Sequence, residues 1–212
     1  KVDGRVVNEL GSKVSPQAKV EILSLGQKQL DEKVTILLNK PKGYVSSQPE
    51  KGYKAAVELI NESNKDPNEK RQFHFKHLRG LAPAGRLDID SQGLLILTSD
   101  GVLAKKIIGD NSEIEKEYLV RVSGILTTDD LKRLRHGELV IEGRKLRPAQ
   151  VEWINKEQLR FVLKEGMKRQ IRKMCEAVGL RVLGLKRVRI GQLKLGKLAE
   201  GQWRYLREGE SV

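Results

Sequence analysis

Short apolar runs separated by polar turns cover most of the chain, which is the pattern of strands rather than of long helices. A continuous apolar run predicts a strand buried on both faces, whereas strict alternation predicts a strand with one exposed face. Continuous runs lie at 34–39 and 93–97, and the segment at 117–122 alternates. Further strands are expected at 139–141, 149–153, 158–163, 181–190 and 201–206.

Fewer segments have helical spacing. Helices are expected at 55–61, 102–108, 127–136 and 166–178. Thr127 and Thr128 precede two aspartates, a helix N-terminal signature, and Gly179 follows the last helix as its C-terminal residue. Many strands with a few separated helices indicate an α+β fold with a mainly antiparallel sheet.

A polar stretch at 26–33 divides the pattern into two parts. Residues 1–32 hold a few short strand-like runs, and residues 33–212 hold the remaining elements. The second part is long enough for one well-packed core. A polar loop rich in Asn, Lys and Glu at 61–72 is expected at its surface.

The net charge and its distribution along the chain indicate an anionic partner. The chain of 212 residues has a formal net charge of +13, and residues 161–198 hold eleven Lys and Arg but two Glu, a local +9. Such a field favours polyphosphates, nucleic acid above all, over a solvated surface without a partner. No apolar run is long enough to cross a membrane, and one cysteine fits a reducing compartment. We therefore expect a cytoplasmic protein, and a monomer because no additional apolar stripe is evident.

The most informative segment is 85–101, where Arg86 and Asp88 precede a glycine, an apolar run and an Asp-Gly turn. A carboxylate at the start of a buried strand can act as a nucleophile or a base if a cation keeps it ionised. The alternative is that Asp88 or Asp90 only caps the turn. A calcium loop fails because Ser99 stands where the bidentate glutamate is required.

Two further groups could complete such a site. Arg169 and Arg172 share one face of the predicted helix at 166–178. One of them could bind a carboxylate while the other binds a phosphate, or both could face solvent. Tyr118 either stacks on a base or packs in the core. Arg187 and Arg189 alternate onto one strand face, as a phosphate-binding pair or a solvated edge. His74 and His77 lie among lysine and arginine residues, so they mark a basic loop rather than a metal site.

The motifs together resemble the RsuA/RluB/RluF-type family of bacterial ribosomal RNA pseudouridine synthases. The resemblance covers residues 2–206 and rests on five motifs in order: NKPKG at 39–43, GRLD with SQGLL at 85–95, KEYLV at 116–120, EGMKRQIRKM at 165–174 and RVRIG at 187–191. It implies the pseudouridine synthase fold, a mixed and mainly antiparallel central sheet with helices flanking a basic RNA cleft. Residues 1–32 would be the end of a small S-four-type RNA-binding domain whose two opening helices precede Lys1.

The resemblance also implies the site. Asp88 would be the catalytic aspartate, Arg172 its ion-pair partner and Tyr118 a contact to the target base. Ile171 would pack near that base, and Arg86 would lie by the RNA backbone or fill the gap left by the base. The remaining substrate-binding residues expected are Lys40, Arg169, Arg187 and Arg189.

The implied reaction converts uridine to pseudouridine in ribosomal RNA, with large-subunit RNA or a pre-ribosomal particle favoured as the partner. Substrate and product are isomers, so neither a cofactor nor a metal is expected. Extracting the uridine from its RNA structure costs about a few kcal/mol. Two alternatives remain open at this stage: a non-catalytic RNA-binding or ribosome-assembly protein, and a carboxylate-dependent hydrolase of a phosphorylated substrate.

Overall fold

The structure is a computed structural model, and it describes residues 1–9, 12–24, 33–47, 49, 52–109, 111–137 and 139–212. The chain divides into two compact units, Lys1–Lys33 and Val34–Val212. The boundary lies one residue beyond the division expected from the sequence. In the first unit, Val2 forms isolated bridges with Arg5 and Val20. The predicted linker at 26–33 falls largely outside the described residues, and the relation of this unit to an S-four-type domain stays a prediction.

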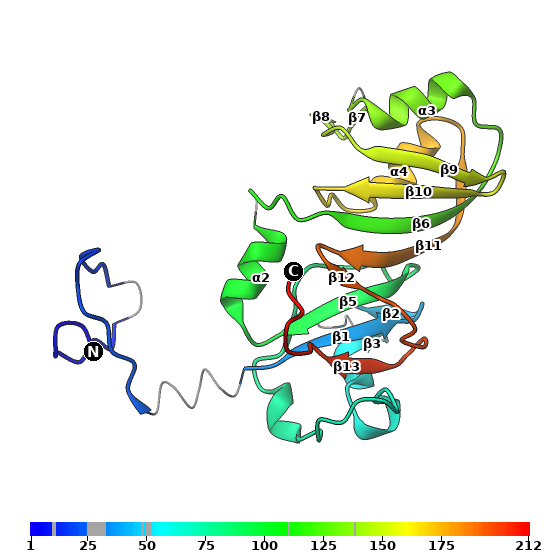
Figure 1. The fold of residues 1–212 in the computed structure, drawn as a ribbon. Helices are drawn as coiled ribbons and strands as arrows, with labels where there is room; N and C mark the ends of the chain where they lie inside the picture. Colours follow the sequence, from blue (N-terminus) through cyan, green and yellow to red (C-terminus); the bar gives the residue numbers. More distant parts are fainter. Residues whose placement is uncertain (10–11, 25–32, 48, 50–51, 110, 138) are drawn as a thin grey trace. The chain divides into compact units, whose positions relative to one another are not determined.

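The second unit is built on one large sheet (Figure 1). Its strands are β1 (Thr35–Lys40), β4 (Ala82–Pro83), β5 (Gln92–Thr98), β6 (Lys116–Ser123), β9 (Gln150–Asn155), β10 (Gln158–Leu163), β11 (Arg181–Ile190), β12 (Leu193–Lys194) and β13 (Trp203–Tyr205). The order is β13-β1-β5-β11-β6-β10-β9, with β12 beside β11 and β4 beside β5. Among the described strands of this sheet, only β5 and β11 pair in parallel. The predicted α+β class with a mixed, mainly antiparallel sheet is therefore confirmed.

Short elements complete the unit. They are the helices α2 (Gly101–Ile108), α3 (Thr128–Arg135) and α4 (Gln170–Glu176), the 3-10 turns η1 (Ala56–Leu59), η2 (Glu62–Asn64) and η3 (Phe75–Leu78), and the ribbons β2 (Tyr44–Val45) with β3 (Lys54–Ala55) and β7 (Val140–Ile141) with β8 (Arg144–Lys145). Two helix predictions were too long. The segment at 55–61 forms only η1, and α4 begins at Gln170 because Arg169 adopts a left-handed conformation with φ 55° that no α-helix can contain.

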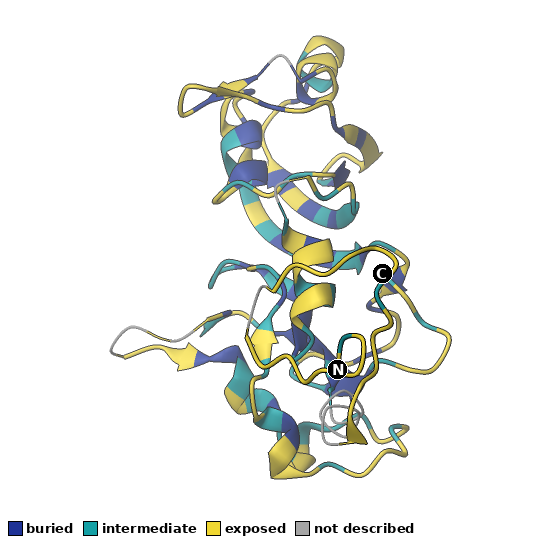
Figure 2. Ribbon diagram, turned by 90° about the vertical axis from the view of Figure 1, so that its left-hand side faces the viewer, coloured by how far each residue is buried: buried dark blue, intermediate teal, exposed yellow. Residues whose placement is uncertain are grey.

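Three apolar clusters explain why these elements hold together. Strands β1 and β5 are buried on both faces, as their continuous apolar runs predicted. One face packs against Trp203, Tyr205 and η1, and the other against Ile107 of α2. The third cluster joins β6, β9 and β10 to α3 and α4. Figure 2 shows the buried residues concentrated along the strands.

The sheet register brings one row of residues together from four strands. Gly93 of β5 pairs with Lys40 of β1 on one side and with Arg187 of β11 on the other, and Arg187 pairs in turn with Tyr118 of β6. Gly93 has φ +109°, and a Cβ there would lie 2.3 Å from the Arg187 carbonyl oxygen. The glycine therefore permits the close approach that brings four widely separated motifs to one place.

Candidate active site

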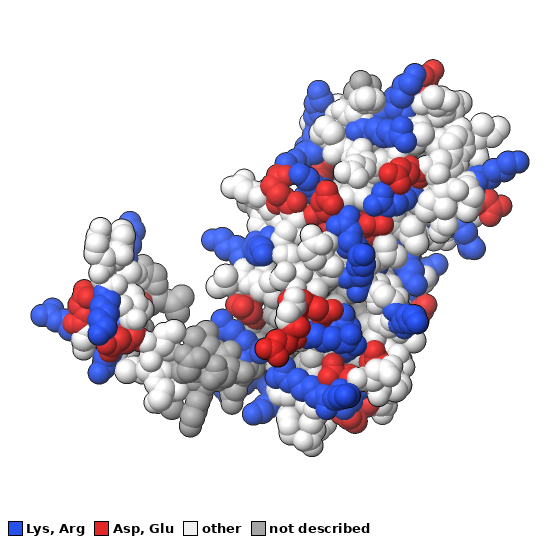
Figure 3. Space-filling view, viewed as in Figure 1, with Lys and Arg blue, Asp and Glu red and all other residues white. Residues whose placement is uncertain are grey.

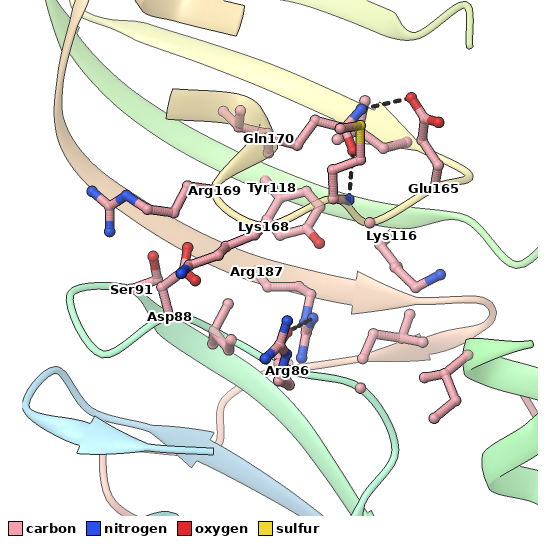
Figure 4. Close-up of a pocket in the computed structure, with 18 of the residues that line it drawn as sticks. Arg86, Asp88, Ser91, Lys116, Tyr118, Glu165, Lys168, Arg169, Gln170 and Arg187 are labelled. Atoms are coloured by element: carbon pink, nitrogen blue, oxygen red, sulfur yellow. Dashed lines mark hydrogen bonds between the residues drawn. The ribbon is translucent and has the colours of Figure 1, made fainter. Parts of the chain in front are cut away.

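A cavity of about 560 Å³ opens beside this row (Figure 4). Its walls come from the segment before β5, from β6, from the end of β10 and from the turn that leads into α4. Of the nine residues predicted to form the site, seven line this cavity: Arg86, Asp88, Tyr118, Arg169, Ile171, Arg172 and Arg187. Lys40 and Arg189 do not. The volume is in the range of small-molecule sites.

Asp88 stands in a firmly held turn at the edge of the cavity. The hydroxyl of buried Ser46 donates to the Leu87 carbonyl at 2.7 Å and accepts from the Leu87 amide at 2.9 Å. The amide of Ser91 donates to the Asp88 carbonyl at 3.0 Å. The Asp88 side chain is half-buried and forms no ion pair with any residue that the structure describes. The backbone is thus fixed while the carboxylate stays available to a ligand.

Arg169, directly before α4, and Arg172 of α4 contact Asp90 rather than Asp88. Arg169 donates to both carboxylate oxygens of Asp90, at 3.2 and 3.1 Å. Nη2 of Arg172 lies 3.1 Å from the same carboxylate and also donates to the Asp90 carbonyl at 3.2 Å. Partial burial works to raise the pKa of Asp90, but the Arg169 hydrogen bond and the Arg172 charge outweigh it and keep the pKa low. The implied Asp88–Arg172 pair is therefore corrected: the partner of Arg172 is two residues further on.

Tyr118 and Ile171 form the inner wall. Both side chains are buried, at 9% and 4% exposure, yet both line the cavity. Figure 4 shows the Tyr118 ring between the Arg169–Lys168 turn and Lys116, and Arg86 on the opposite side of the opening. A flat ring and an apolar side chain facing an exposed arginine suit a planar base carrying a charged backbone.

Lys40 is not a surface contact, which corrects its predicted substrate-binding role. Its side chain is fully buried, and its ammonium donates to the carbonyls of Pro41 at 2.9 Å and Tyr44 at 2.8 Å. Burial, together with the positive charge of Arg187, lowers the pKa of Lys40 to about 8, although the charges of Asp88 and Asp90 oppose the shift. Lys40 therefore supports the loop below the site from within the fold.

This burial makes stability depend on pH. The unfolded lysine titrates near 10.4, so between pH 8 and that value the unfolded chain binds more protons and stability rises with pH. Relative to Lys40→Met, the parent is expected to gain roughly 3 kcal/mol of unfolding free energy over this window. Urea unfolding of both proteins at a series of pH values measures the difference. Parallel curves would contradict the assignment.

Arg187 and Arg189 do not share one face as predicted. The pairing of β11 with β6 shifts register between these residues, and this bulge breaks the two-residue alternation. Arg187 is 3% exposed and donates to the carbonyls of Leu94 and Arg86. Arg189 instead pairs with Glu117 at 2.7 Å and Glu115 at 3.1 Å. Phosphate binding by Arg189 therefore stays a prediction, and a phosphate would have to compete with these two carboxylates for its guanidinium.

Sequence reasoning assigned no site role to Lys116. Its side chain lines the cavity, and burial together with Arg187 lowers the pKa of its ammonium. The alternation of β6, which places residues 116 and 118 on one side, was the available signal. Charges elsewhere on this unit are mixed: Figure 3 shows acidic groups interspersed among Lys and Arg, and Arg160 pairs with both Glu117 and Glu152. Many Lys and Arg side chains are therefore paired with acids, and only part of the positive charge is available to a ligand.

Comparison with known proteins shows the family to which the chain belongs. The sequence profile of the family described as RNA pseudouridylate synthase matches residues 34–177. The chain belongs to the RNA pseudouridine synthase family. It is 35% identical over 97% of its length to the ribosomal large subunit pseudouridine synthase B of Bacillus subtilis, covering 81% of that protein. It is 32% identical to the ribosomal small subunit pseudouridine synthase A of Yersinia pestis, over 97% of this chain and 83% of that one.

The fold agrees with this assignment. A crystal structure of a pseudouridylate synthase matches with a TM-score of 0.71 and 26% sequence identity, over 98% of this chain and 84% of that one. The chain is thus an RNA pseudouridine synthase, an isomerase, as the sequence resemblance implied. This outcome excludes the non-catalytic and hydrolase alternatives. No helix among the described residues is long and apolar enough to cross a membrane.

Proposed function

We propose that Asp88 is the catalytic aspartate of this RNA pseudouridine synthase. The observation that supports the proposal is a half-buried carboxylate on a fixed turn, at the edge of the cavity of about 560 Å³, without an ion-pair partner among the described residues. Asp90, the other acid of the turn, already binds two arginines. Only Asp88 therefore has a carboxylate that a substrate can reach without breaking an existing ion pair.

The reaction requires an ionised carboxylate that acts at the sugar. The bond between ribose C1′ and uracil N1 breaks, the uracil turns and C5 bonds to C1′. The C5 hydrogen leaves as a proton, and N1 takes up a proton. Asp88 would attack the sugar as a nucleophile or accept a proton from it as a base, and both roles require an ionised acid. No atom is gained or lost overall, so the residues need to hold the detached base rather than supply a cofactor.

The neighbours have supporting roles in this proposal. Arg172 is a positioning residue, because its contacts to Asp90 and to the Ser91 hydroxyl at 3.4 Å hold the turn that carries Asp88. Its Nε is buried without a hydrogen-bond partner in the described part of the chain, so one donor remains for the site. Tyr118 and Ile171 would hold the uracil while it turns, and Arg86 would contact the RNA outside the cavity.

For the substrate we propose a single uridine in large-subunit ribosomal RNA. The 35% identity to the Bacillus subtilis large-subunit enzyme over nearly the whole chain supports this choice over the small subunit, to whose enzyme the identity is 32%. Direct mapping of the modified uridine distinguishes the two subunits.

Carbodiimide mapping of ribosomal RNA from cells with and without the gene tests the substrate. Pseudouridine retains the carbodiimide adduct and stops reverse transcription, so loss of one stop in large-subunit RNA is the expected result. Loss of a stop in small-subunit RNA would overturn the choice of subunit, and unchanged stops in both RNAs would overturn the ribosomal substrate.

A further inference from the structure

An exposed aromatic side chain lies outside the cavity, on the loop that follows η2. Phe75 begins η3 and is 82% exposed, among the highest values for a large apolar residue in the described chain. The polar loop at 61–72 leads to it. This loop lies along edge strand β13, where the Asp66 amide donates to the Trp203 carbonyl at 2.8 Å and the Trp203 indole donates to the Asn61 carbonyl at 2.8 Å. The exposed ring thus belongs to an anchored segment.

A series of edge-on ring contacts connects Phe75 to the core. Its ring meets Phe73 edge-on with centroids 5.5 Å apart, and Phe73 meets fully buried Trp203 at the same separation. Beyond them, Nδ1 of His77 lies 2.6 Å from the Tyr205 hydroxyl. Each ring is supported by the next down to the core, so the outer face of Phe75 is presented with little loss of freedom on binding.

Cations without acids surround this ring in the sequence. Residues 70–79 contain two lysines, two arginines and two histidines but no Asp or Glu. Lys70 and Arg79 are exposed and form no ion pair with a described residue, and the Arg71 guanidinium lies over the Tyr205 ring at 4.4 Å. An exposed aromatic ring with two exposed cations, Lys70 and Arg79, within five residues of it in the sequence suits a partner that has both flat bases and phosphates.

We propose that Phe75 and its flanking cations form a second RNA-binding surface, on which an unpaired base of the substrate RNA stacks while Lys70 and Arg79 bind phosphates. We call these three residues the Phe75 platform. The inference rests on RNA being the substrate and not on which residue catalyses.

Phe75→Ala is the test, with Phe75→Trp as a rescue and Ile125→Ala as the matched control. Ile125 is 87% exposed and lies between β6 and α3, in a part of the chain that is distant in sequence from the platform. Affinity for a fluorescently labelled oligouridylate is expected to fall roughly tenfold in Phe75→Ala and to return in Phe75→Trp. KM for ribosomal RNA from cells lacking the gene should rise comparably, with kcat within about twofold of the parent.

The charge part of the proposal has its own readout. Lys70→Ala and Arg79→Ala should each reduce the slope of log affinity against log salt by about 0.7. Unchanged affinity in Phe75→Ala, or a loss equal to that in Ile125→Ala, would overturn the stacking. Unchanged affinity and slope in all variants would overturn the RNA surface and leave a protein partner as the occupant. Because oligouridylate binding needs no turnover, these results are separate from the assignment of Asp88.

Discussion

Replacing Asp88 with asparagine is expected to lower turnover at least about a thousandfold while leaving RNA affinity within a few fold. The amide has the shape of the acid but can neither attack the sugar nor accept its proton. Since Asp88 forms no ion pair with a described residue, its neutralisation removes no contact that the fold depends on. Release of tritium from RNA carrying 5-tritiated uridine measures the reaction, because bonding at C5 displaces that hydrogen.

Asp90→Asn is the matched control, two positions away in the same turn. This change weakens the bonds from Arg169 and Arg172, so it should loosen the turn and reduce turnover by about tenfold rather than abolish it. In the folded protein the two arginines keep the pKa of Asp90 low, so their ion pairs with Asp90 stabilise the parent above that pKa. This stabilisation is lost as the pH falls through the pKa. An Asp90 variant without turnover beside an active Asp88 variant would reverse the assignment.

Gly93→Ala is expected to have the largest effect on the fold. An added Cβ would lie 2.3 Å from the carbonyl oxygen and 2.7 Å from the amide nitrogen of Arg187, and φ +109° is itself strained for alanine. Overpacking against backbone and backbone strain together should cost roughly 4 kcal/mol of unfolding free energy. Because Arg187 pairs with Tyr118, separating β5 from β11 should also reduce turnover.

Gly196→Ala separates the two causes. Gly196 has φ +61° but no atom within 4 Å of an added Cβ, so only the conformational cost of about 1 kcal/mol is expected. Urea unfolding of both variants gives the comparison. Equal losses would show that the close approach of β5 and β11 is not what Gly93 provides.

The strands of this fold are readable from the sequence because burial on one or both faces leaves a direct pattern. The runs containing Leu94 and Ile36 form strands buried on both faces, as predicted. Helix boundaries were less readable. The helical spacing of apolar residues continues from 166 into α4, but Arg169 adopts a left-handed backbone that ties the turn to Asp90. Its contact is with a residue 79 positions away in the sequence, and no local pattern reports either this contact or the backbone conformation.

The same limit applies to the site. The family resemblance implied one site for Asp88, Tyr118 and Arg172, and all three line one cavity. The resemblance could not show that Arg172 binds Asp90, since two acids in one turn are equally close in sequence. It also could not show the β-bulge that gives Arg187 and Arg189 different surroundings. Basic residues predict phosphate contact only where no acid of another strand meets them, and that is set by the sheet register.

Complementation of cells lacking the gene gives the most direct test of the catalytic assignment. Ribosomal RNA is mapped with carbodiimide after expression of the parent, Asp88→Asn or Asp90→Asn at equal protein levels. We expect one uridine to regain its stop with the parent and with Asp90→Asn, and to remain unmodified with Asp88→Asn. Restoration of that stop by Asp88→Asn would contradict the account, because the reaction would then proceed without the carboxylate to which it is assigned.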